Sequence, residues 1–203
     1  MDLTTVSATT NRDAWAPLIE RAKRLDPEAL DEIVEKLAPR LFAFLFRLTG
    51  RRTEAEELVQ EVFLRVVRWI DRYEHDGRFE PWLFRIASNA FRDRKRHERR
   101  HPPPASLDGG TEDGEVERGD DAALTDRDGP APEAKVMREE DVDRLDRALQ
   151  RLSEAEREVV LLRHYSGMSF EEIAVLMETP LGTALARAHR GLKKLREWME
   201  LST

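Results

Sequence analysis

The residues after His101 have a composition that packed domains do not have, and they limit the folds open to this chain. The run PPPASLDGGTEDGEVERGDDAALTDRDGPAPE consists mainly of proline, glycine and acidic residues and has no periodic apolar face. Such a segment cannot bury enough apolar surface to offset the entropy of ordering, so we expect it to be disordered in isolation. The chain is therefore expected to form two small helical domains joined by an acidic linker.

The expected boundaries follow from this break in composition. We predict a disordered tail over residues 1–14, an N-terminal domain over 15–101, the linker over 102–135 and a C-terminal domain over 136–203. The linker has two open interpretations: it is a solvated spacer, or it is an acidic strand that mimics nucleic acid inside a basic channel.

The net charge of −7 belongs to the middle of the chain. Residues 102–139 contain 11 acidic and 4 basic side chains, a balance of −7. Residues 1–101 contain 20 basic and 18 acidic side chains, and residues 140–203 contain 10 and 12. Both ends are nearly neutral and include locally basic helices, so the acidic total does not argue against nucleic-acid binding.

Helix start and stop signals run through the N-terminal part of the chain. Asp26 and Pro27 have the order of an N-cap and a first-turn proline, so they predict the start of a helix. Pro39 predicts the start of a second helix over residues 40–49, which is apolar nearly all round and ends at Gly50. No strand pattern stands out in the sequence, and the expected fold class is all-α.

Three capping-box patterns, in which serine or threonine precedes glutamate by three residues, begin at Thr53, Ser153 and Ser169. The last of them opens a short helix, and Thr179 with Pro180 then predicts the start of a longer, basic helix. A short helix, a tight turn and a longer helix form the outline of a helix-turn-helix unit.

Residues 80–100 predict one helix with two different faces. One arc is apolar and is expected to pack on the domain core. The opposite arc is polar and basic and consists of Arg85, Asn89, Arg92 and Arg96. Trp82 lies at the border, where it could pack in the core, stack on a base, or do both. Cations beside an aromatic ring suit a polyanion with accessible bases, which indicates a nucleic acid.

The last helix is strongly basic. Between Arg187 and Arg196 it has five cations and no acidic residue, so it could enter a major groove and contact phosphates. A basic run by itself is more often a solvated helix face. The capped helix and the tight turn before it favour contact with DNA instead.

Several other kinds of site find no support. The chain has no cysteine, which excludes disulfides and thiolate metal sites. His97 and His101 are spaced to hold one metal, but no further ligand completes the site, and no cofactor is expected. No nucleophile motif, phosphate-binding loop or paired inward carboxylates indicate an enzyme. Without a signal peptide or an apolar run long enough to span a bilayer, we expect a cytoplasmic protein with no membrane insertion.

Two stretches resemble the extracytoplasmic-function (ECF) sigma factors, the small two-domain class of the sigma-70 superfamily. AEELVQEVFLRVVRW (Ala55–Trp69) followed by FEPWLFRIASNAFRDRKR (Phe79–Arg96) is similar to the family's second region, and Leu152–Glu197 is similar to its fourth region. The resemblance implies a dissociable subunit of RNA polymerase that directs promoter recognition, DNA melting and transcription initiation. It also implies an anti-sigma factor as a partner.

The resemblance further implies three sets of contact residues. The set that would dock on the clamp helices of the largest subunit of core RNA polymerase consists of Glu56, Leu58, Val59, Gln60, Glu61, Phe63 and Arg65. The set that would hold the minus-ten element of promoter DNA consists of Arg78, Trp82, Arg85, Asn89, Arg92 and Arg96. The set that would contact the minus-thirty-five element consists of Thr183, Arg187, Arg190 and Lys193.

The stretch that is similar to the fourth region departs from the family pattern in the turn of the helix-turn-helix unit and in the basic helix that follows the turn. Family members usually have glycine where this chain has Glu178, and a left-handed non-glycine residue costs about 1 kcal/mol unless the turn differs. Leu185 and Ala186 replace two polar residues. Either Leu185 touches a thymine methyl group, or the helix is rotated. The core stripe of the rotated helix would consist of Leu181, Leu185, Leu192 and Leu195.

Two other functions remain open at this point. A free-standing helix-turn-helix regulator would explain the C-terminal part but would leave the polar face of residues 56–68 without a purpose. A polymerase-binding protein with impaired minus-thirty-five reading would explain Leu185, Ala186 and Glu178.

Overall fold

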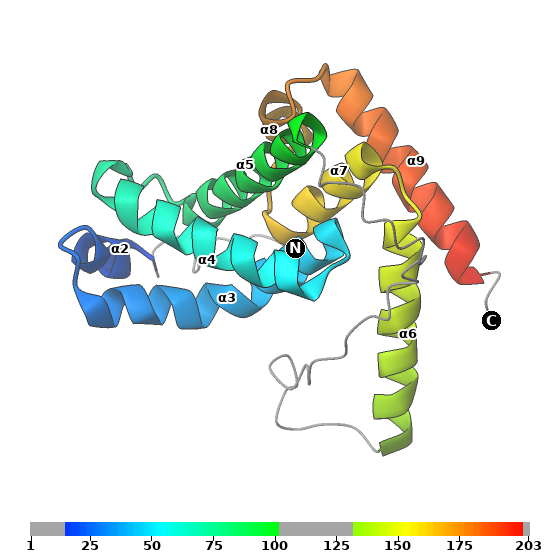
Figure 1. Cartoon of the computed structure of the whole chain (residues 1–203), viewed down its shortest axis with the longest axis horizontal. Helices are drawn as coiled ribbons and strands as arrows, with labels where there is room; N and C mark the ends of the chain where they lie inside the picture. Colours follow the sequence, from blue (N-terminus) through cyan, green and yellow to red (C-terminus); the bar gives the residue numbers. More distant parts are fainter. Residues whose placement is uncertain (1–14, 102–131, 201–203) are drawn as a thin grey trace, which may run out of the picture.

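The computed structural model describes residues 15–101 and 132–200, and every regular element in these two ranges is a helix (Figure 1). The N-terminal elements are α2 (Ala16–Ala22), α3 (Pro27–Thr49), α4 (Arg52–Trp69), the short 3₁₀ helix η1 (Ile70–Arg72) and α5 (Phe79–Arg100). The C-terminal elements are α6 (Pro132–Gln150), α7 (Glu154–Tyr165), α8 (Phe170–Leu176) and α9 (Leu181–Glu200). The expected all-α fold is confirmed. The predicted tail and the linker up to residue 131 lie outside the described residues, and α6 begins inside the range predicted as linker.

Helices α3, α4 and α5 pack side by side in the N-terminal domain (Figure 1). Their facing sides are apolar, and Leu45 of α3, Leu58 of α4 and Leu83 of α5 are fully buried. Burial of one leucine side chain contributes about 1.5–3 kcal/mol, so this shared core holds the three helices in fixed positions. On α5 the buried side is the one that the helical period predicts, and Ala87 and Ala90 also lie in the core.

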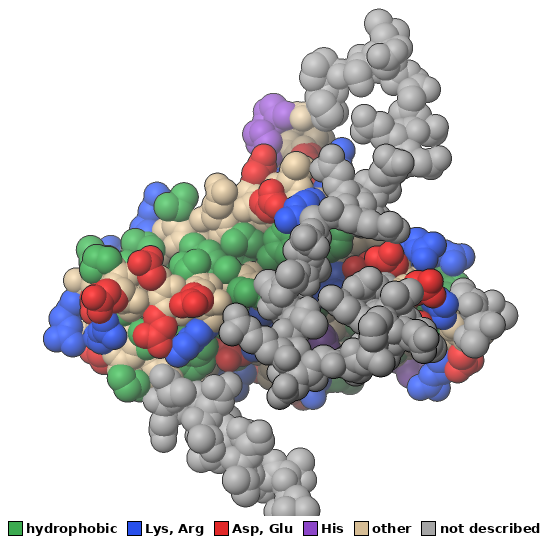
Figure 2. All heavy atoms as spheres, turned by 90° about the horizontal axis from the view of Figure 1, so that it is seen from below, with side chains coloured by type: hydrophobic (Ala, Val, Ile, Leu, Met, Phe, Trp, Pro, Cys, Tyr) green, Lys and Arg blue, Asp and Glu red, His purple; other side chains and the backbone are tan. Residues whose placement is uncertain are grey.

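The surface seen from below the view of Figure 1 is mixed in charge (Figure 2). Acidic and basic side chains stand next to each other at the end that holds α2, and a band of hydrophobic side chains crosses the middle. Neighbouring charges of opposite sign largely cancel beyond a Debye length, which is about 10 Å at 0.1 M salt. Where the side chains of this side are visible, opposite charges thus alternate at the end that holds α2.

Helix α3 is one continuous helix, so the prediction of a second helix that starts at Pro39 is wrong. Proline removes one backbone donor and breaks many helices. Here Leu37 and Leu41 are buried on either side of it, and their contacts with the core keep the helix continuous. The predicted ends of this segment are confirmed: the Asp26 carboxylate accepts a hydrogen bond from the backbone N–H two residues on (3.1 Å), and Gly50 ends α3 with φ +75°.

The capping box predicted at Thr53 is also wrong: the N-cap of α4 is Arg51, two residues earlier, so Thr53 lies inside the helix. The bend before α4 is held instead by Thr49, whose hydroxyl accepts a hydrogen bond from the Arg51 N–H (3.2 Å). The other two capping boxes are confirmed. Ser153 and Ser169 each accept a hydrogen bond from the N–H of the glutamate three residues on, whose carboxylate bonds back to the N-cap backbone.

Helix α9 packs on α7 through small side chains. Its buried residues are Ala184, Ala188, Gly191 and Leu195. A Cβ atom at Gly191 would come within 3.0 Å of the Val160 side chain, so glycine lets the two helices lie close together. Of the four leucines in the alternative core stripe only Leu195 is buried, so the rotated helix is wrong. Leu185 is 44% exposed.

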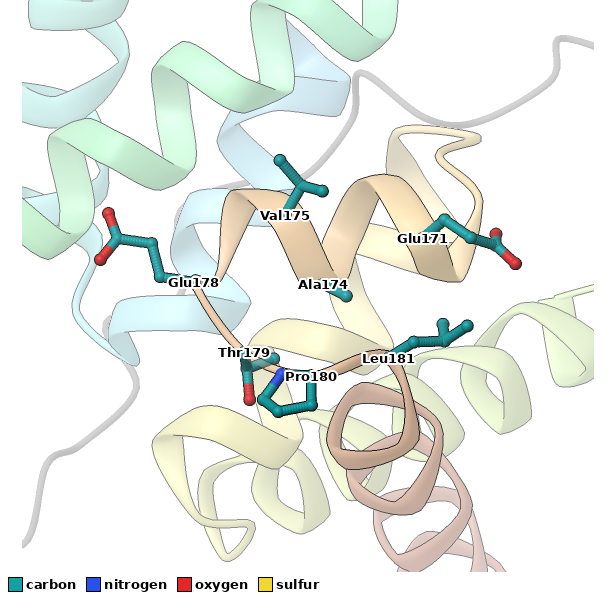
Figure 3. Close-up of a pocket in the computed structure, with 7 residues that line it drawn as sticks. All are labelled: Glu171, Ala174, Val175, Glu178, Thr179, Pro180 and Leu181. Atoms are coloured by element: carbon teal, nitrogen blue, oxygen red, sulfur yellow. The ribbon is translucent and has the colours of Figure 1, made fainter.

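A glutamate, Glu178, lies in the turn between α8 and α9 (Figure 3). Its backbone has a conformation that glycine adopts more readily. Glu178 has φ +48°. Its N–H donates to the Val175 carbonyl (3.2 Å), and the next N–H donates to the Ala174 carbonyl (3.0 Å), which are the two bonds of a Schellman motif. The turn thus has the shape expected for glycine, and Glu178 bears a conformational cost of about 1 kcal/mol.

The two domains pack against each other and share one apolar cluster. Helix α7 lies beside α3 and α5, and the centroid of its Tyr165 ring lies 5.9 Å from that of Phe44 and 6.2 Å from that of Phe84 (Figure 1). Arg47 of α3 lies 2.8 Å from Asp146 of α6. The described residues therefore form a closed arrangement, which the sequence did not predict.

Replacement of Glu178 by glycine should stabilise the protein. Glycine adopts this φ without steric cost, although it also gives the unfolded chain more freedom, so we expect the free energy of unfolding to rise by about 0.5 kcal/mol. Urea titrations followed by circular dichroism measure this difference. Glu178→Ala removes the same charge but keeps a Cβ atom, and an equal rise for both variants would contradict the strain assigned to the turn.

Candidate nucleic-acid and polymerase interfaces

The polar arc of α5 is divided between solvent and the C-terminal domain. Arg85, Asn89 and Arg96 are exposed and lie along one side of the helix, as the sequence predicts. Arg78 and Arg92, from the same predicted set, are only partly exposed, because both reach carboxylates of the other domain. The exposed side chains form a surface that a phosphate backbone could approach.

Trp82 lies at the edge of the core. Its ring centroid lies 4.5 Å from that of Tyr73 and 5.6 Å from that of Phe79, and both of these neighbours are buried. These contacts hold the ring in place, while part of it stays open to solvent. The predicted packing of Trp82 against the core is confirmed, and its stacking on a base stays a prediction.

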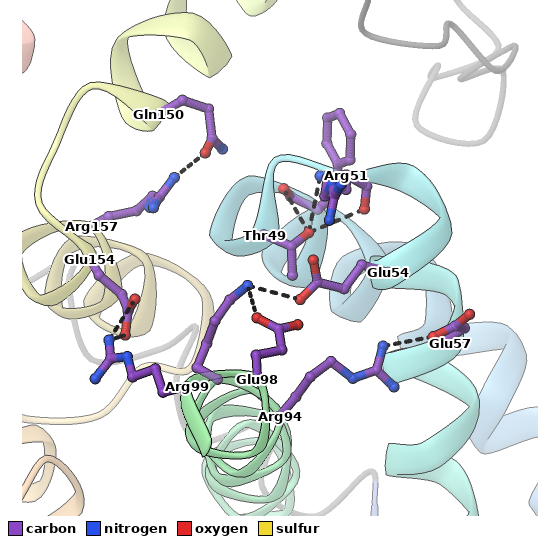
Figure 4. Close-up of polar contacts among 12 residues, drawn as sticks. Thr49, Arg51, Glu54, Glu57, Arg94, Glu98, Arg99, Gln150, Glu154 and Arg157 are labelled. Carbon is purple, nitrogen blue, oxygen red and sulfur yellow. Dashed lines mark hydrogen bonds and ion pairs between the residues drawn. The ribbon is translucent and has the colours of Figure 1, made fainter. Parts of the chain in front are cut away.

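Ion pairs fix the orientation of α5 on α4. Arg94 lies 2.7 Å from Glu57, and the Lys95 ammonium lies 3.3 Å from Glu54 and 3.0 Å from Glu98 (Figure 4). Glu54 is buried, and a buried carboxylate requires a compensating cation. Rotation of α5 about its own axis would break the pair between Lys95 and Glu54, so the polar arc keeps a fixed direction.

The exposed side of α4 is the candidate polymerase-binding surface. Glu56 and Gln60 are exposed, and the partly exposed members of the predicted set are Val59, Glu61, Phe63 and Arg65. Leu58 is fully buried, so its place among the contact residues is wrong: a side chain enclosed by the core cannot also touch a partner. The structure adds Leu64, which is 68% exposed. The sequence contained a signal for this exposure, because Leu64 follows Gln60 by four residues and so lies on the same side of the helix, away from the core.

The four residues predicted for the minus-thirty-five element lie on one side of α9. Thr183 and Arg187 are partly exposed, and Arg190 and Lys193 are exposed. At 100° per residue they fall within about one third of the helix circumference. They could therefore follow one wall of a groove and contact its phosphates together.

One buried carboxylate attaches the basic side of α9 to α7. Glu156 is 5% exposed and lies 2.8 Å from Lys194 and 3.4 Å from Arg190. The hydrogen bond from Lys194, assisted by those from Ser153, outweighs the effect of burial and lowers the pKa of Glu156 from 4.5 to about 2. The carboxylate therefore stays ionised at neutral pH and fixes the direction in which the cations of α9 point.

Sequence reasoning missed the carboxylates that reach α5 from the other domain, Glu158 and Glu172. One signal was present. Glu158, Leu162 and Tyr165 follow helical spacing on α7, so a carboxylate interrupts an otherwise apolar side. A charge on a side that is otherwise suited to burial indicates an oppositely charged partner.

A shallow hollow lies at the turn between α8 and α9 and is lined by Glu171, Ala174, Val175, Glu178, Thr179, Pro180 and Leu181 (Figure 3). Its lining is mainly apolar and includes no nucleophile beside a base. Among the described side chains of residues 15–101 and 140–200, no group of three histidine or carboxylate side chains could hold a metal ion. None of the described helices is long and apolar enough to cross a membrane.

Two family models and two relatives identify the family of this chain. The family model of Sigma-70 region 2 matches residues 33–101, and that of Sigma-70, region 4 matches residues 143–195. The chain is 37% identical to the RNA polymerase sigma factor CarQ of Myxococcus xanthus, over 88% of this chain and 94% of that protein. It is 31% identical to the ECF RNA polymerase sigma factor SigW of Bacillus subtilis, over 88% and 93%. The chain belongs to the ECF sigma factors.

Two solved structures share the fold of this ECF sigma factor. CnrH in complex with the cytosolic domain of CnrY is 20% identical with a TM-score of 0.59, over 95% of this chain and 99% of that one. The sigma factor RpoE of Bartonella quintana in complex with the anti-sigma factor NepR is 24% identical with a TM-score of 0.59, over 85% and 98%. The family membership makes this chain an alternative sigma factor that directs transcription initiation.

Glu156→Gln should destabilise the C-terminal domain of this sigma factor by about 1 kcal/mol at neutral pH, because glutamine cannot form the ion pair with the part-exposed Lys194. A carboxyl group with a depressed pKa stabilises the fold above its unfolded pKa of 4.5. That contribution is lost as the pH falls through its folded pKa of about 2. Urea titrations should therefore show the wild type and the variant converging as the pH falls from 4.5 towards 2.

Glu197→Gln serves as the control, because its carboxylate lies 3.8 Å from Lys193 and is 53% exposed. It should change the free energy of unfolding by less than about 0.5 kcal/mol at any pH. A deficit of Glu156→Gln that is as large at pH 2 as at pH 7 would contradict the role given to this ion pair.

Proposed function

We propose that the exposed side of α4 docks on the clamp helices of the largest subunit of core RNA polymerase. The observation that carries this proposal is Leu64, which is exposed among polar neighbours that include Gln60 and Glu61. An apolar centre with a polar rim is a common form of protein interface, because the rim excludes water from the centre. A free-standing DNA-binding regulator would have no use for such a surface on α4.

Residues 15–101 also hold the minus-ten element, through α5. Arg85 and Arg96 neutralise phosphates, and Asn89 between them offers an amide to a base edge. Trp82 supplies a stacking surface for a base that has left the duplex. Extraction of a base costs a few kcal/mol, and stacking on an aromatic ring offsets part of that cost.

Residues 136–203 hold the minus-thirty-five element, through α9. Arg187, Arg190 and Lys193 contact phosphates, and Thr183 lies near the start of the helix, where base edges come within reach. Leu185 is exposed in the same part of the helix. An aliphatic side chain there fits the methyl group of thymine, so this chain reads apolar features where polar side chains are usual.

Two further parts of the proposal concern partners and location. An anti-sigma factor is a proposed partner, supported by the similar folds of CnrH bound to the cytosolic domain of CnrY and of RpoE bound to the anti-sigma factor NepR. The chain works in the cytoplasm, where its polymerase meets DNA. The polymerase makes the bonds of the transcript, and this chain contributes binding without catalysis.

Leu64→Glu tests the polymerase surface. The side chain is 68% exposed, so the change should leave the fold intact while it places a charge at the centre of the proposed contact. We expect the affinity for purified core polymerase to fall about tenfold or more, equivalent to about 1.4 kcal/mol, with a parallel loss of run-off transcripts from genomic fragments. Fluorescence anisotropy of labelled protein measures the affinity.

Val175→Glu is the matched control for this test, because it places the same charge at a 73% exposed valine on α8. It should bind core polymerase like the wild type. If Leu64→Glu binds with wild-type affinity, the docking surface lies elsewhere on the molecule. If the wild type gives tight binding and discrete transcripts, the initiation function is established together with its promoter sequences.

Arg85→Ala combined with Arg96→Ala tests the minus-ten surface. Loss of two phosphate contacts should weaken promoter opening about tenfold and reduce its salt dependence, while core binding is kept. Permanganate reactivity of unpaired thymines at saturating polymerase measures the opening. Arg24→Ala combined with Arg72→Ala removes two exposed arginines of the same domain that lie outside α5, and should have little effect. Equal opening by the two double variants would argue against the assignment of α5.

A further inference from the structure

Two carboxylates of the C-terminal domain form ion pairs with arginines from the set predicted to hold the minus-ten element. The Glu158 carboxylate of α7 lies 2.8 Å from Arg92 and accepts a hydrogen bond from the Ser88 hydroxyl (2.5 Å). The Glu172 carboxylate of α8 pairs with Arg78, directly before α5. Arg92 also donates a hydrogen bond to the last main-chain carbonyl of α8. Two of the cations predicted to contact DNA are therefore already bound within the chain.

The contacts of Glu158 are largely removed from water, whereas the Arg78 and Glu172 side chains are 37% and 32% exposed. Ser88 is 0% and Glu158 4% exposed, and the Arg92 side chain is 21% exposed. An arginine and a carboxylate that leave water together depend on each other, because removal of one leaves the other as an uncompensated buried charge. At the far end of α5, Arg99 lies 3.4 Å from Glu154, and that pair is open to solvent (Figure 4). The acidic residues of α7 and α8 thus follow α5 along its length.

A second group of contacts joins the domains on the side of α3. Arg40 donates a hydrogen bond to the Tyr165 main-chain carbonyl, and Arg47 donates one to the Tyr165 hydroxyl while it pairs with Asp146 at 2.8 Å. The ring of Tyr165 covers Phe44 of the same helix. This mixture of aromatic contacts by Tyr165 and several arginine pairs resembles interfaces between domains that move relative to each other.

The closed arrangement cannot lie along a promoter. Elements named for positions minus ten and minus thirty-five are about 25 base pairs apart, or about 85 Å of B-DNA at 3.4 Å per base pair. In the closed arrangement α5 contacts α7, on which α9 packs, so the two reading helices are only about 20 Å apart. Residues 102–131, fully extended, can span about 100 Å, so the chain is long enough to bridge the promoter once the domains part.

We propose that the acidic side of α7 and α8, formed by Glu158 and Glu172, competes with promoter DNA for Arg92 and Arg78 and holds the free sigma factor closed. The inference rests on the proposed function of α5. Carboxylates and phosphates both accept charge-assisted hydrogen bonds from arginine, so one anion can replace the other. A closed population lowers the apparent affinity for DNA in proportion to the fraction that is open.

Glu158→Gln combined with Glu172→Gln tests the competition. Glutamine keeps the shape of both side chains and also serves in a capping box, so α8 should keep its start at Ser169. The control, Glu171→Gln combined with Glu197→Gln, removes the same charge from the same domain. Glu171 is exposed, and Glu197 is 53% exposed and pairs within its own helix.

Energy transfer between the domains measures the closure without any DNA. The chain has no cysteine, so cysteines introduced at the exposed Thr53 and Arg147 can carry a donor and an acceptor dye, one on each domain. We expect the transfer to fall in the Glu158 and Glu172 double variant and to stay at the wild-type level in the control. Equal transfer in all three proteins would overturn the proposal, because the pairs would not hold the domains together.

Binding of a single DNA strand then measures the competition. The probe is a fluorescein-labelled strand with the non-template minus-ten sequence of a promoter found by run-off transcription. We expect the free Glu158 and Glu172 double variant to bind it about three- to tenfold more tightly than the wild type and the control, because a larger fraction is open. A fall in energy transfer without tighter binding would overturn the competition with DNA.

The two levels of the proposal fail in different ways. If the wild type binds core polymerase and gives transcripts while the double variant matches it in energy transfer and strand affinity, only this inference fails. If the wild type neither binds core polymerase nor gives transcripts, the proposed function fails and the competition with promoter DNA fails with it. The transfer difference would in that case still show that the two pairs hold the domains closed.

Discussion

Helix α5 has to satisfy three neighbours at once, and the rest of the molecule depends on how it divides its surface. One side packs on α3 and α4, a second side places Ser88 and Arg92 against Glu158, and the third, basic side faces solvent. The helical period allows this, because residues three and four apart stay on the same side. The pair between Lys95 and Glu54 prevents rotation, so each side stays opposite its own neighbour.

The interactions between the domains specify one relative orientation, but each ion pair among them contributes little net free energy. A buried pair such as that of Arg92 and Glu158 costs both ions their water, so it contributes little compared with an apolar contact of equal size. The exposed pair of Arg99 and Glu154 contributes about 0–1 kcal/mol. Tyr165 adds apolar area. Such an interface selects one arrangement strongly, yet an anion of similar chemistry can replace each of its carboxylates.

Sequence patterns were sufficient where a few neighbouring residues decide the outcome. The capping boxes at Ser153 and Ser169 could be predicted because each of their hydrogen bonds spans only three residues. Predictions failed where packing outweighs local preference: Pro39 lies inside α3 because the core holds the helix on both sides of it. Leu58 failed as a contact for a related reason. A family motif records which residues recur in a surface helix, but it does not say which of them face the core, and the exposed leucine of α4 is Leu64.

By itself, the sequence determined that the described parts of the chain are helical, where several of the helices begin and end, and to which family the chain belongs. These properties depend on residues close together in the chain or on the similarity of whole motifs. Only the tertiary structure decided that Arg92 meets Glu158 and that Arg78 meets Glu172, across separations of 66 and 94 residues. No periodic pattern links positions so far apart, because their contact depends on how entire helices pack around a shared core.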